Sequence, residues 1–329
     1  MQHDPSLCIA DVLAARRRIA DSVRHTPLEP SPSLSARTGR SVSLKLESEQ
    51  VTGSFKIRGA AHALSRLDER ARERGVVAAS TGNHGRALAT AARKTGVRAT
   101  ICVSELVPKN KLDAIRELGA ELRVVGKSQD DAQLEVDRLV AEEGMSAIPP
   151  FDHPDVIAGQ GTLGLEIAAD DPAIDTVVVP LSGGGLIAGV GVAIKALLPA
   201  ARVVGVSMER GAAMAASLRA GHPVDVAEVP SLADSLGGGI GAENRYTLRM
   251  VQKFVDEVAL VSEAEIAEGM RHAYREERRI LEGAAAVGIA ALLAERIEGL
   301  GRRVAVVASG KNIDMDAFSR VVHGGWNGP

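Results

Sequence analysis

Residues 176–195 read Thr-Val-Val-Val-Pro-Leu-Ser-Gly-Gly-Gly-Leu-Ile-Ala-Gly-Val-Gly-Val-Ala-Ile-Lys. The stretch opens as a continuous apolar run, which is typical of a strand buried on both faces of a parallel sheet. Gly183, Gly184 and Gly185 follow, and an apolar helical pattern comes directly after them. Such a turn gathers backbone N–H groups in one concavity at a helix N-terminus, where an anion is favoured, and a Cβ there would block its approach. We therefore predict a strand, a phosphate-binding turn and a helix.

The same alternation of strand and helix recurs along the chain. We predict strands at residues 42–46, 76–79, 99–103, 122–125, 176–181, 203–207 and 304–309. We predict helices at residues 85–95, 109–118, 132–143, 186–198 and 263–278. Repeated strand–helix–strand units form parallel sheets through right-handed crossovers. Aromatic residues are only 2% of the chain, so small aliphatic residues must build the core, as helices on a parallel sheet allow. The predicted fold class is α/β.

The length of 329 residues allows two lobes. Three prolines interrupt the pattern within residues 144–155, and a second break is expected near residues 68–75. We therefore expect a small α/β domain, residues 71–148, inserted into a large cofactor-binding domain formed by residues 1–70 and 149–329.

Composition and charge exclude several classes of function. The net charge is −3 and both signs are interspersed, which argues against a nucleic-acid-binding or polybasic membrane role. No apolar run approaches the roughly 20 residues that span a bilayer. Cys8 and Cys102 belong to no Cys/His cluster, which suggests reduced thiols instead of disulfides or a zinc site. With no visible signal peptide, a cytoplasmic location is expected.

The glycine turn alone leaves two kinds of cofactor open. Gly183, Gly185 and Ala188 also satisfy the Gly-x-Gly-x-x-Gly/Ala dinucleotide pattern, and Glu209 could serve as the acid that binds the ribose. The turn therefore indicates a phosphate but does not distinguish a nicotinamide cofactor from another phosphate-bearing one.

A second turn with the same arrangement is Ser80-Thr-Gly-Asn-His-Gly85, which follows an apolar run and precedes an Ala-rich helix. Hydroxyl groups and N–H groups at a helix start favour a carboxylate. Asn83 could hydrogen-bond a planar oxygen, and His84 could titrate near neutrality. Singly, these residues also have ordinary interpretations: Ser80 as a helix cap, Asn83 in a left-handed turn and His84 as a surface histidine.

Lys56 lies in Thr52-Gly-Ser-Phe-Lys-Ile-Arg-Gly59, at the head of another helical run. Most lysines are solvated surface charges. Here the flanking residues are Phe55 and Ile57, and a lysine in an apolar wall can be neutral and nucleophilic toward an aldehyde. Ser309 closes the last predicted strand, the usual place for a cofactor contact in an open α/β sheet.

Five motifs occur in the order seen in one known family: Ser54-Phe-Lys-Ile-Arg-Gly-Ala60, Ser80-Thr-Gly-Asn-His-Gly85, Ala158-Gly-Gln-Gly-Thr162, Ser182-Gly-Gly-Gly-Leu186 and Ser309-Gly-Lys-Asn312. The chain resembles, from about His25 to Asp314, the fold-type II pyridoxal-phosphate enzymes of the threonine/serine dehydratase and serine racemase group. The resemblance implies a tryptophan synthase β-like fold, with two open parallel-sheet lobes and the cofactor between them.

The resemblance also implies a role for each motif residue. Lys56 would bind the cofactor's aldehyde and later carry the Cα proton, and Thr81 stands where racemases have a second acid/base. The residues implied to bind the cofactor are Phe55, Lys56, Asn83, Ser182, Gly183, Gly184, Gly185, Leu186 and Ser309. Those implied at the substrate carboxylate are Ser80, Thr81 and His84.

The implied partner of the pyridine nitrogen, Ser309, favours one reaction. A hydroxyl does not keep that nitrogen protonated, so the ring is a weaker electron sink and expulsion of a β-hydroxyl is favoured. The cofactor phosphate is a reasonable general acid for that departure. We expect a dehydratase that converts a β-hydroxy-α-amino acid into a 2-keto acid and ammonia.

Three other functions compete with this one. A racemase of the same family is possible through Thr81, although β-branching limits its rotamers. A nicotinamide oxidoreductase would leave Lys56 unexplained, and nothing supports a catalytically silent binding protein.

Two finer expectations come from family patterns. The metal site of some relatives needs acidic residues where Ser207-Met-Glu-Arg-Gly-Ala-Ala213 has serine and alanine, so no metal is expected. Residues 231–246 resemble the hydroxyectoine-utilisation dehydratase branch, which implies a hydroxylated amino acid derived from hydroxyectoine as a possible substrate. A homodimer is implied by the resemblance alone.

Overall fold

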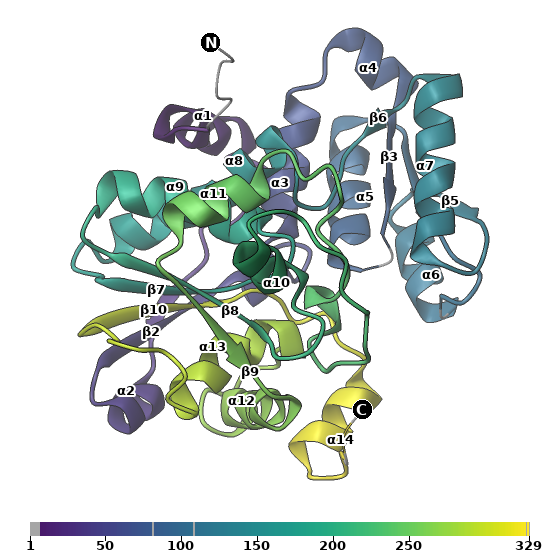
Figure 1. Cartoon of the computed structure of the whole chain (residues 1–329). Coiled ribbons are helices and arrows are strands. Elements are labelled where there is room, and N and C mark those ends of the chain that lie inside the picture. Colours follow the sequence, from purple (N-terminus) through teal and green to yellow (C-terminus); the bar gives the residue numbers. More distant parts are fainter. Residues whose placement is uncertain (1–6, 81, 108, 327, 329) are drawn as a thin grey trace.

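Two open sheets organise the chain, and the computed structural model describes residues 7–80, 82–107, 109–326 and 328 (Figure 1). The larger sheet has six strands in the order β1-β2-β10-β7-β8-β9, and the smaller has four in the order β5-β4-β3-β6. All the pairings are parallel except that β1 runs antiparallel to β2.

Buried apolar strands form the six-stranded sheet. Its strands are β1 (Leu28–Pro30), β2 (Ser41–Leu46), β7 (Thr176–Pro180), β8 (Arg202–Met208), β9 (Glu257–Val261) and β10 (Arg303–Ala308). Val178, Val204 and Val206 pack with one hydrophobic cluster, and Val177 and Val179 with another. A strand with both faces covered needs apolar residues at every position, which is why these runs lack polar alternation.

Helices cover both faces of this sheet (Figure 1). The helices associated with it are α1 (Ile9–Ile19), α2 (Pro32–Thr38), α3 (Lys56–Ser65), α8 (Pro154–Asp170), α9 (Gly185–Leu197), α10 (Ala213–Ala220), α11 (Thr247–Phe254), α12 (Glu263–Arg275), α13 (Gly283–Leu293) and α14 (Met315–Val322). In Figure 1, α8, α9 and α11 lie above the sheet and α2, α12 and α13 below it. Two short 3-10 turns, η1 (Glu47–Glu49) and η2 (Asp234–Leu236), complete this part.

The four-stranded sheet is built from β3 (Val76–Ala79), β4 (Ala99–Val103), β5 (Glu121–Val124) and β6 (Ser146–Ala147). Helices α4 (Glu69–Arg74), α5 (Asn83–Thr95), α6 (Lys109–Glu117) and α7 (Gln129–Glu143) accompany it. The chain then returns through residues 148–153, the crossing segment, and Pro154 begins α8. These strands lie inside residues 71–148, while the division into domains stays a prediction.

The structure also bears on membrane-spanning helices, metal sites and the two cysteines. None of the helices in the described ranges combines the length and apolar character needed to cross a membrane. Nor do the described residues bring together three or more His, Cys, Asp or Glu side chains that could hold a metal ion. Cys8 and Cys102 are both free thiols.

Candidate active site

The predicted motifs meet at the carboxyl ends of strands. Residues 182–185 follow β7, residues 309–312 follow β10 and residues 80–85 follow β3. The loop that carries Lys56 pairs with the one after β10: Ser54 forms a bridge with Gly310, the Phe55 N–H donates to the Ser309 carbonyl at 3.1 Å, and the Lys311 N–H donates to the Gly53 carbonyl at 2.9 Å. Ligands bind in open α/β sheets at this edge.

Lys56 is the first residue of α3, and its amine lies in a largely desolvated place. Its Nζ donates a hydrogen bond to the carbonyl of Pro150 at 2.8 Å and lies 5.2 Å from the centre of the Phe55 ring. The residue as a whole is half-buried, and loss of water around the amine is the main influence on its charge. Burial lowers the pKa of Lys56 from 10.5 to about 8, although the charge of Glu282 raises it. A sizeable neutral fraction near pH 8 is what attack on an aldehyde requires.

The glycine turn after β7 packs against the crossing segment. A Cβ on Gly183 would lie 2.4 Å from the ring of Phe151, and one on Gly185 would lie 2.8 Å from the Cα of that residue. Gly184 has a φ of +89°. The close approach of a phosphate is one reason for glycine at these positions. The structure adds a different cause, since Phe151 alone already excludes a side chain at Gly183 and Gly185.

The same turn keeps backbone donors available. Helix α9 begins at Gly185, and the first N–H groups of a helix have no partner within it. Among the described residues, no hydrogen-bond acceptor is found for the N–H groups of Gly183, Gly184, Gly185 and Leu186. Four such donors beside Ser182, at the positive end of a helix of 13 residues, fit a phosphate group.

A relay of side chains orients Asn83. The Asn312 Nδ2 donates to the Thr52 carbonyl at 2.9 Å and to the Asn83 Oδ1 at 2.6 Å. Since a carbonyl can only accept, this fixes which way both amides face, and the Asn83 Nδ2 then donates to Glu282 at 2.8 and 3.1 Å. Asn83 is the first residue of α5 and does not adopt the left-handed turn that the sequence left open.

Glu282 was missed by the sequence reasoning. It is 4% exposed, precedes α13 and lies next to Gly310, where a Cβ would be 2.2 Å from its carboxylate. The only local signal was an acidic residue before a uniformly apolar helix, which reads as an ordinary helix start. Its place beside Asn83 depends on contacts across 199 residues of sequence.

His84 does not titrate near neutrality, and that expectation was wrong. The side chain is 3% exposed, and its Nε2 lies 2.7 Å from the Ile148 carbonyl. Burial, together with the charge of Lys56, lowers its pKa to about 3 although the bond to Ile148 raises it. The neutral ring therefore donates from Nε2 and leaves Nδ1 as an acceptor, with no hydrogen-bond partner in the described part of the chain. It has no second N–H to offer a carboxylate.

The same turn holds two other predicted site residues, Ser80 and Thr81. The Ser80 Oγ accepts from the Gly85 N–H at 3.2 Å, but Ser80 is not the N-cap of α5, because that position is Gly82. Thr81 lies outside the described residues.

Comparison with known proteins decides the family. Residues 19–310 match the model of the pyridoxal-phosphate dependent enzymes. The chain belongs to this family.

Individual pyridoxal-phosphate dependent enzymes are similar to this chain over nearly its whole length. A Sinorhizobium fredii (strain NGR234) protein with the provisional name threonine dehydratase is 60% identical over 97% of this chain and 96% of its own. The L-threonine ammonia-lyase of Thermotoga maritima is 42% identical over 97% of this chain and 79% of its own. The structure of maize serine racemase superposes with a TM-score of 0.90, at 31% identity and over 97% of each chain.

These comparisons establish the fold-type II architecture and pyridoxal phosphate as the cofactor of this lyase and ammonia-lyase group. The nicotinamide alternative for Gly183–Gly185 is wrong. When bound, pyridoxal phosphate supplies an aldehyde, a ring that accepts electrons and a phosphate. The Lys56 amine, with its lowered pKa, fits the aldehyde, and the free N–H groups after β7 fit the phosphate.

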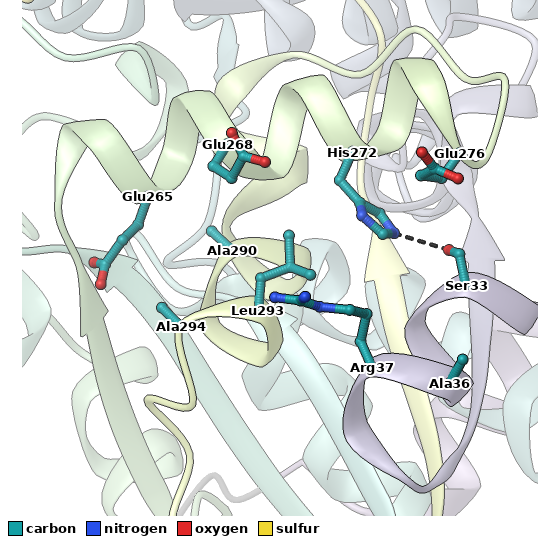
Figure 2. Close-up of a pocket in the computed structure, with 10 residues that line it drawn as sticks. All are labelled: Ser33, Ala36, Arg37, Glu265, Glu268, His272, Glu276, Ala290, Leu293 and Ala294. Carbon is teal, nitrogen blue, oxygen red and sulfur yellow. Dashed lines mark hydrogen bonds between the residues drawn. The ribbon is translucent and has the colours of Figure 1, made fainter.

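A cavity of about 500 Å³ lies elsewhere, between α2, α12 and α13 (Figure 2). Its lining residues are Ser33, Ala36, Arg37, Glu265, Glu268, His272, Glu276, Ala290, Leu293 and Ala294. The His272 Nε2 and the Ser33 Oγ lie 2.8 Å apart at one end, as Figure 2 shows. None of the predicted site residues that the structure describes lines this cavity.

Proposed function

We propose that this enzyme removes water from a β-hydroxy-α-amino acid to give a 2-keto acid and ammonia. The observation that carries the proposal is the buried Ser309 at the end of β10, bonded through its carbonyl to the loop of the low-pKa Lys56. A hydroxyl at this place adds no charge that would stabilise a carbanion, so loss of the β-hydroxyl is favoured. The relatives with the names L-threonine ammonia-lyase and, provisionally, threonine dehydratase support the same reaction class.

The balance of the proposed reaction is simple. The Cα–H and Cβ–O bonds of the substrate break, and the Cα proton and the hydroxyl leave as one water. The enamine that remains takes up one water, so that a 2-keto acid and ammonia are the net products. Lys56 would move the Cα proton, which is general acid–base work by a positioned amine.

The remaining predicted residues would bind and orient. Ser182 and the N–H groups of Gly183 through Leu186 would hold the phosphate, and Asn83, oriented by Glu282, would donate to an oxygen on the ring. Phe55 would pack on that ring. The substrate carboxylate would lie at the turn of residues 80–85, held by backbone N–H groups instead of the His84 ring.

A substrate panel with a matched pair of variants tests the proposal. Wild type, Lys56→Ala and Lys311→Ala would be given threonine, serine, 3-hydroxyaspartate and hydroxyectoine-derived hydroxy amino acids, with 2-keto acid and ammonia measured. We expect Lys56→Ala to lose about 10³-fold in rate. Lys311→Ala, an exposed lysine on the neighbouring loop, should keep full activity. Release of keto acid by Lys56→Ala at the wild-type rate would overturn the proposal.

Racemisation is the second candidate because of the likeness to maize serine racemase. It predicts exchange of the Cα proton with solvent and formation of the other enantiomer without ammonia. Chiral chromatography of the same panel separates the two reactions. The homodimer, the cytoplasmic location, and the absence of a nucleic-acid partner and a metal stay predictions.

A further inference from the structure

The crossing segment, residues 148–153, contacts three of the sequence motifs that carry the predicted site residues. Its Ile148 carbonyl bonds to His84, its Pro150 carbonyl accepts from Lys56, and Phe151 packs under Gly183. The next residue, Asp152, has no part in the proposed chemistry, yet it makes the most concentrated set of hydrogen bonds in this segment.

The carboxylate of Asp152 accepts from three consecutive backbone N–H groups. Its Oδ2 accepts from Arg245 at 2.7 Å, and its Oδ1 accepts from Tyr246 at 2.9 Å and from Thr247 at 2.8 Å. Thr247 is the first residue of α11, and the residue before it provides no side-chain cap. Asp152 therefore caps α11 from 95 residues away, and its negative charge suits that end of the helix.

Helix α11 in turn contacts the glycine turn. A Cβ on Gly184 would lie 3.1 Å from the Cβ of Thr247 and 3.1 Å from a methyl group of Val251. The crossing segment thus packs against Gly183 and Gly185, and α11 packs against Gly184, where the methyl group of Met214 of α10 would also lie 2.8 Å from such a Cβ. Asp152 is the side chain that joins the crossing segment to α11.

We propose that Asp152 is the positioning residue of the phosphate-binding turn. By tying the crossing segment to α11, it holds Gly183–Gly185 in the backbone conformation in which their N–H groups converge. The inference rests on the proposed function only in taking this turn to be the phosphate site. It predicts that Asp152 determines how much the phosphate contributes to cofactor affinity, beyond any contribution to folding.

A matched control exists elsewhere in the chain. Asp175 also accepts from consecutive backbone N–H groups, from Arg302 at 2.8 Å and from Arg303 at 3.2 Å. It precedes β7, whereas the glycine turn follows that strand. Asp175→Asn should therefore destabilise the fold in a similar way without disturbing the phosphate site.

The experiment measures two dissociation constants on cofactor-depleted wild type, Asp152→Asn and Asp175→Asn. One is for pyridoxal phosphate, and the other is for pyridoxal, which has the same aldehyde and no phosphate. The ratio of the two constants reports the phosphate contribution, and the melting temperature is recorded for each protein. We expect Asp152→Asn to reduce the ratio at least tenfold and Asp175→Asn to leave it within about twofold of wild type.

The measurements distinguish a failure of the phosphate-site assignment from a failure of the role proposed for Asp152. If wild type binds pyridoxal and pyridoxal phosphate equally well, the assignment of the turn as a phosphate site fails. If wild type discriminates and Asp152→Asn discriminates just as strongly with a lower melting temperature, Asp152 is only a helix cap and the inference is overturned. Should Asp152→Asn not fold, the ratio is read for Asp152→Glu, which moves the carboxylate by one methylene. A ratio unchanged there also overturns the inference.

Discussion

Lys56 illustrates how much of a residue's chemistry comes from its surroundings. Burial pushes the pKa of its amine down, and the Glu282 carboxylate pushes it back up, with a result of about 8. His84 lies in the same environment, and both burial and the Lys56 charge lower its pKa to about 3. The same desolvation therefore gives a lysine that titrates close to neutrality and a histidine that stays neutral.

This balance predicts a pH dependence. Only a neutral amine attacks an aldehyde, so the rate at which cofactor-depleted protein takes up pyridoxal phosphate should rise with pH through a midpoint near 8. Glu282→Gln removes the charge that favours the protonated amine, so its midpoint should lie below that of wild type. Stopped-flow absorbance measures both.

Glu298→Gln, at an exposed glutamate, is the control and should keep the wild-type midpoint. A midpoint that moves upward in Glu282→Gln would contradict the assigned electrostatics.

Helix α3 places Lys56, and a buried ion cluster holds this helix. Arg58, two positions after Lys56, is fully buried and bonds to Glu47 of η1 at 2.8 Å and to Glu166 of α8 at 2.6 and 2.9 Å. Lys45 lies 2.8 Å from Glu166 and extends the cluster into β2. Charges this deep are tolerated only when they are paired, so the cluster ties α3 to η1, α8 and β2.

Removing one partner should therefore cost far more than removing a surface pair. We expect Arg58→Met to lower the free energy of unfolding by about 3–5 kcal/mol, because Glu47 stays buried without the guanidinium that pairs with it. Glu166 keeps its ion pair with Lys45 but loses the one with Arg58. Arg303→Met breaks an exposed pair with Asp171 and should cost less than about 1 kcal/mol. Urea denaturation of both variants measures the difference, and equal losses would refute the role given to the cluster.

The relay through Asn83 links residues that lie in the parts of the chain built on the two sheets. Asn83 begins α5, which belongs to the four-stranded sheet, whereas Thr52, Glu282 and Asn312 belong to the part built on the six-stranded sheet. Arg86 adds a long contact to the Asn312 Oδ1 at 3.4 Å. Because the site takes residues from both parts, its geometry depends on how the two parts are placed relative to each other.

Asn312→Ala tests this dependence. It removes the hydrogen bonds to Thr52 and Asn83, so we expect a loss of about 1–2 kcal/mol in stability, weaker cofactor binding and faster amide hydrogen exchange in α5. Asn244→Ala is the matched control, because Asn244 makes a similar set of bonds to Ile240, Thr247 and Leu248 within one part of the molecule. Asn244→Ala should leave amide hydrogen exchange in α5 unchanged. Equal exchange in the two variants would argue against a link through Asn312.

The elements that could be predicted share one property, which is a strong local pattern. Continuous apolar runs such as β3 and β7 are present, each within one residue of the predicted ends. Strands β6 and β9 lack such a pattern and were not predicted. Strand β6 has only two residues and forms through its pairing with β3, and β9 is only partly buried. Helices α8 and α13 are buried on all sides and therefore lack the amphipathic contrast by which helices are recognised.

The sequence by itself determined the α/β class, the glycine turn after β7 and the family of the chain, with Lys56 in one of its motifs. Each of these depends on residues close together in the sequence or on motifs in a fixed order. Only the tertiary structure decided that Glu282 lies beside Asn83, that Asp152 caps α11 and that Phe151 excludes side chains from the glycine turn. It also decided that Lys56 and His84 have lowered pKa values. The physical reason is that burial and contacts between distant segments exist only once the chain has folded, and local patterns do not record them.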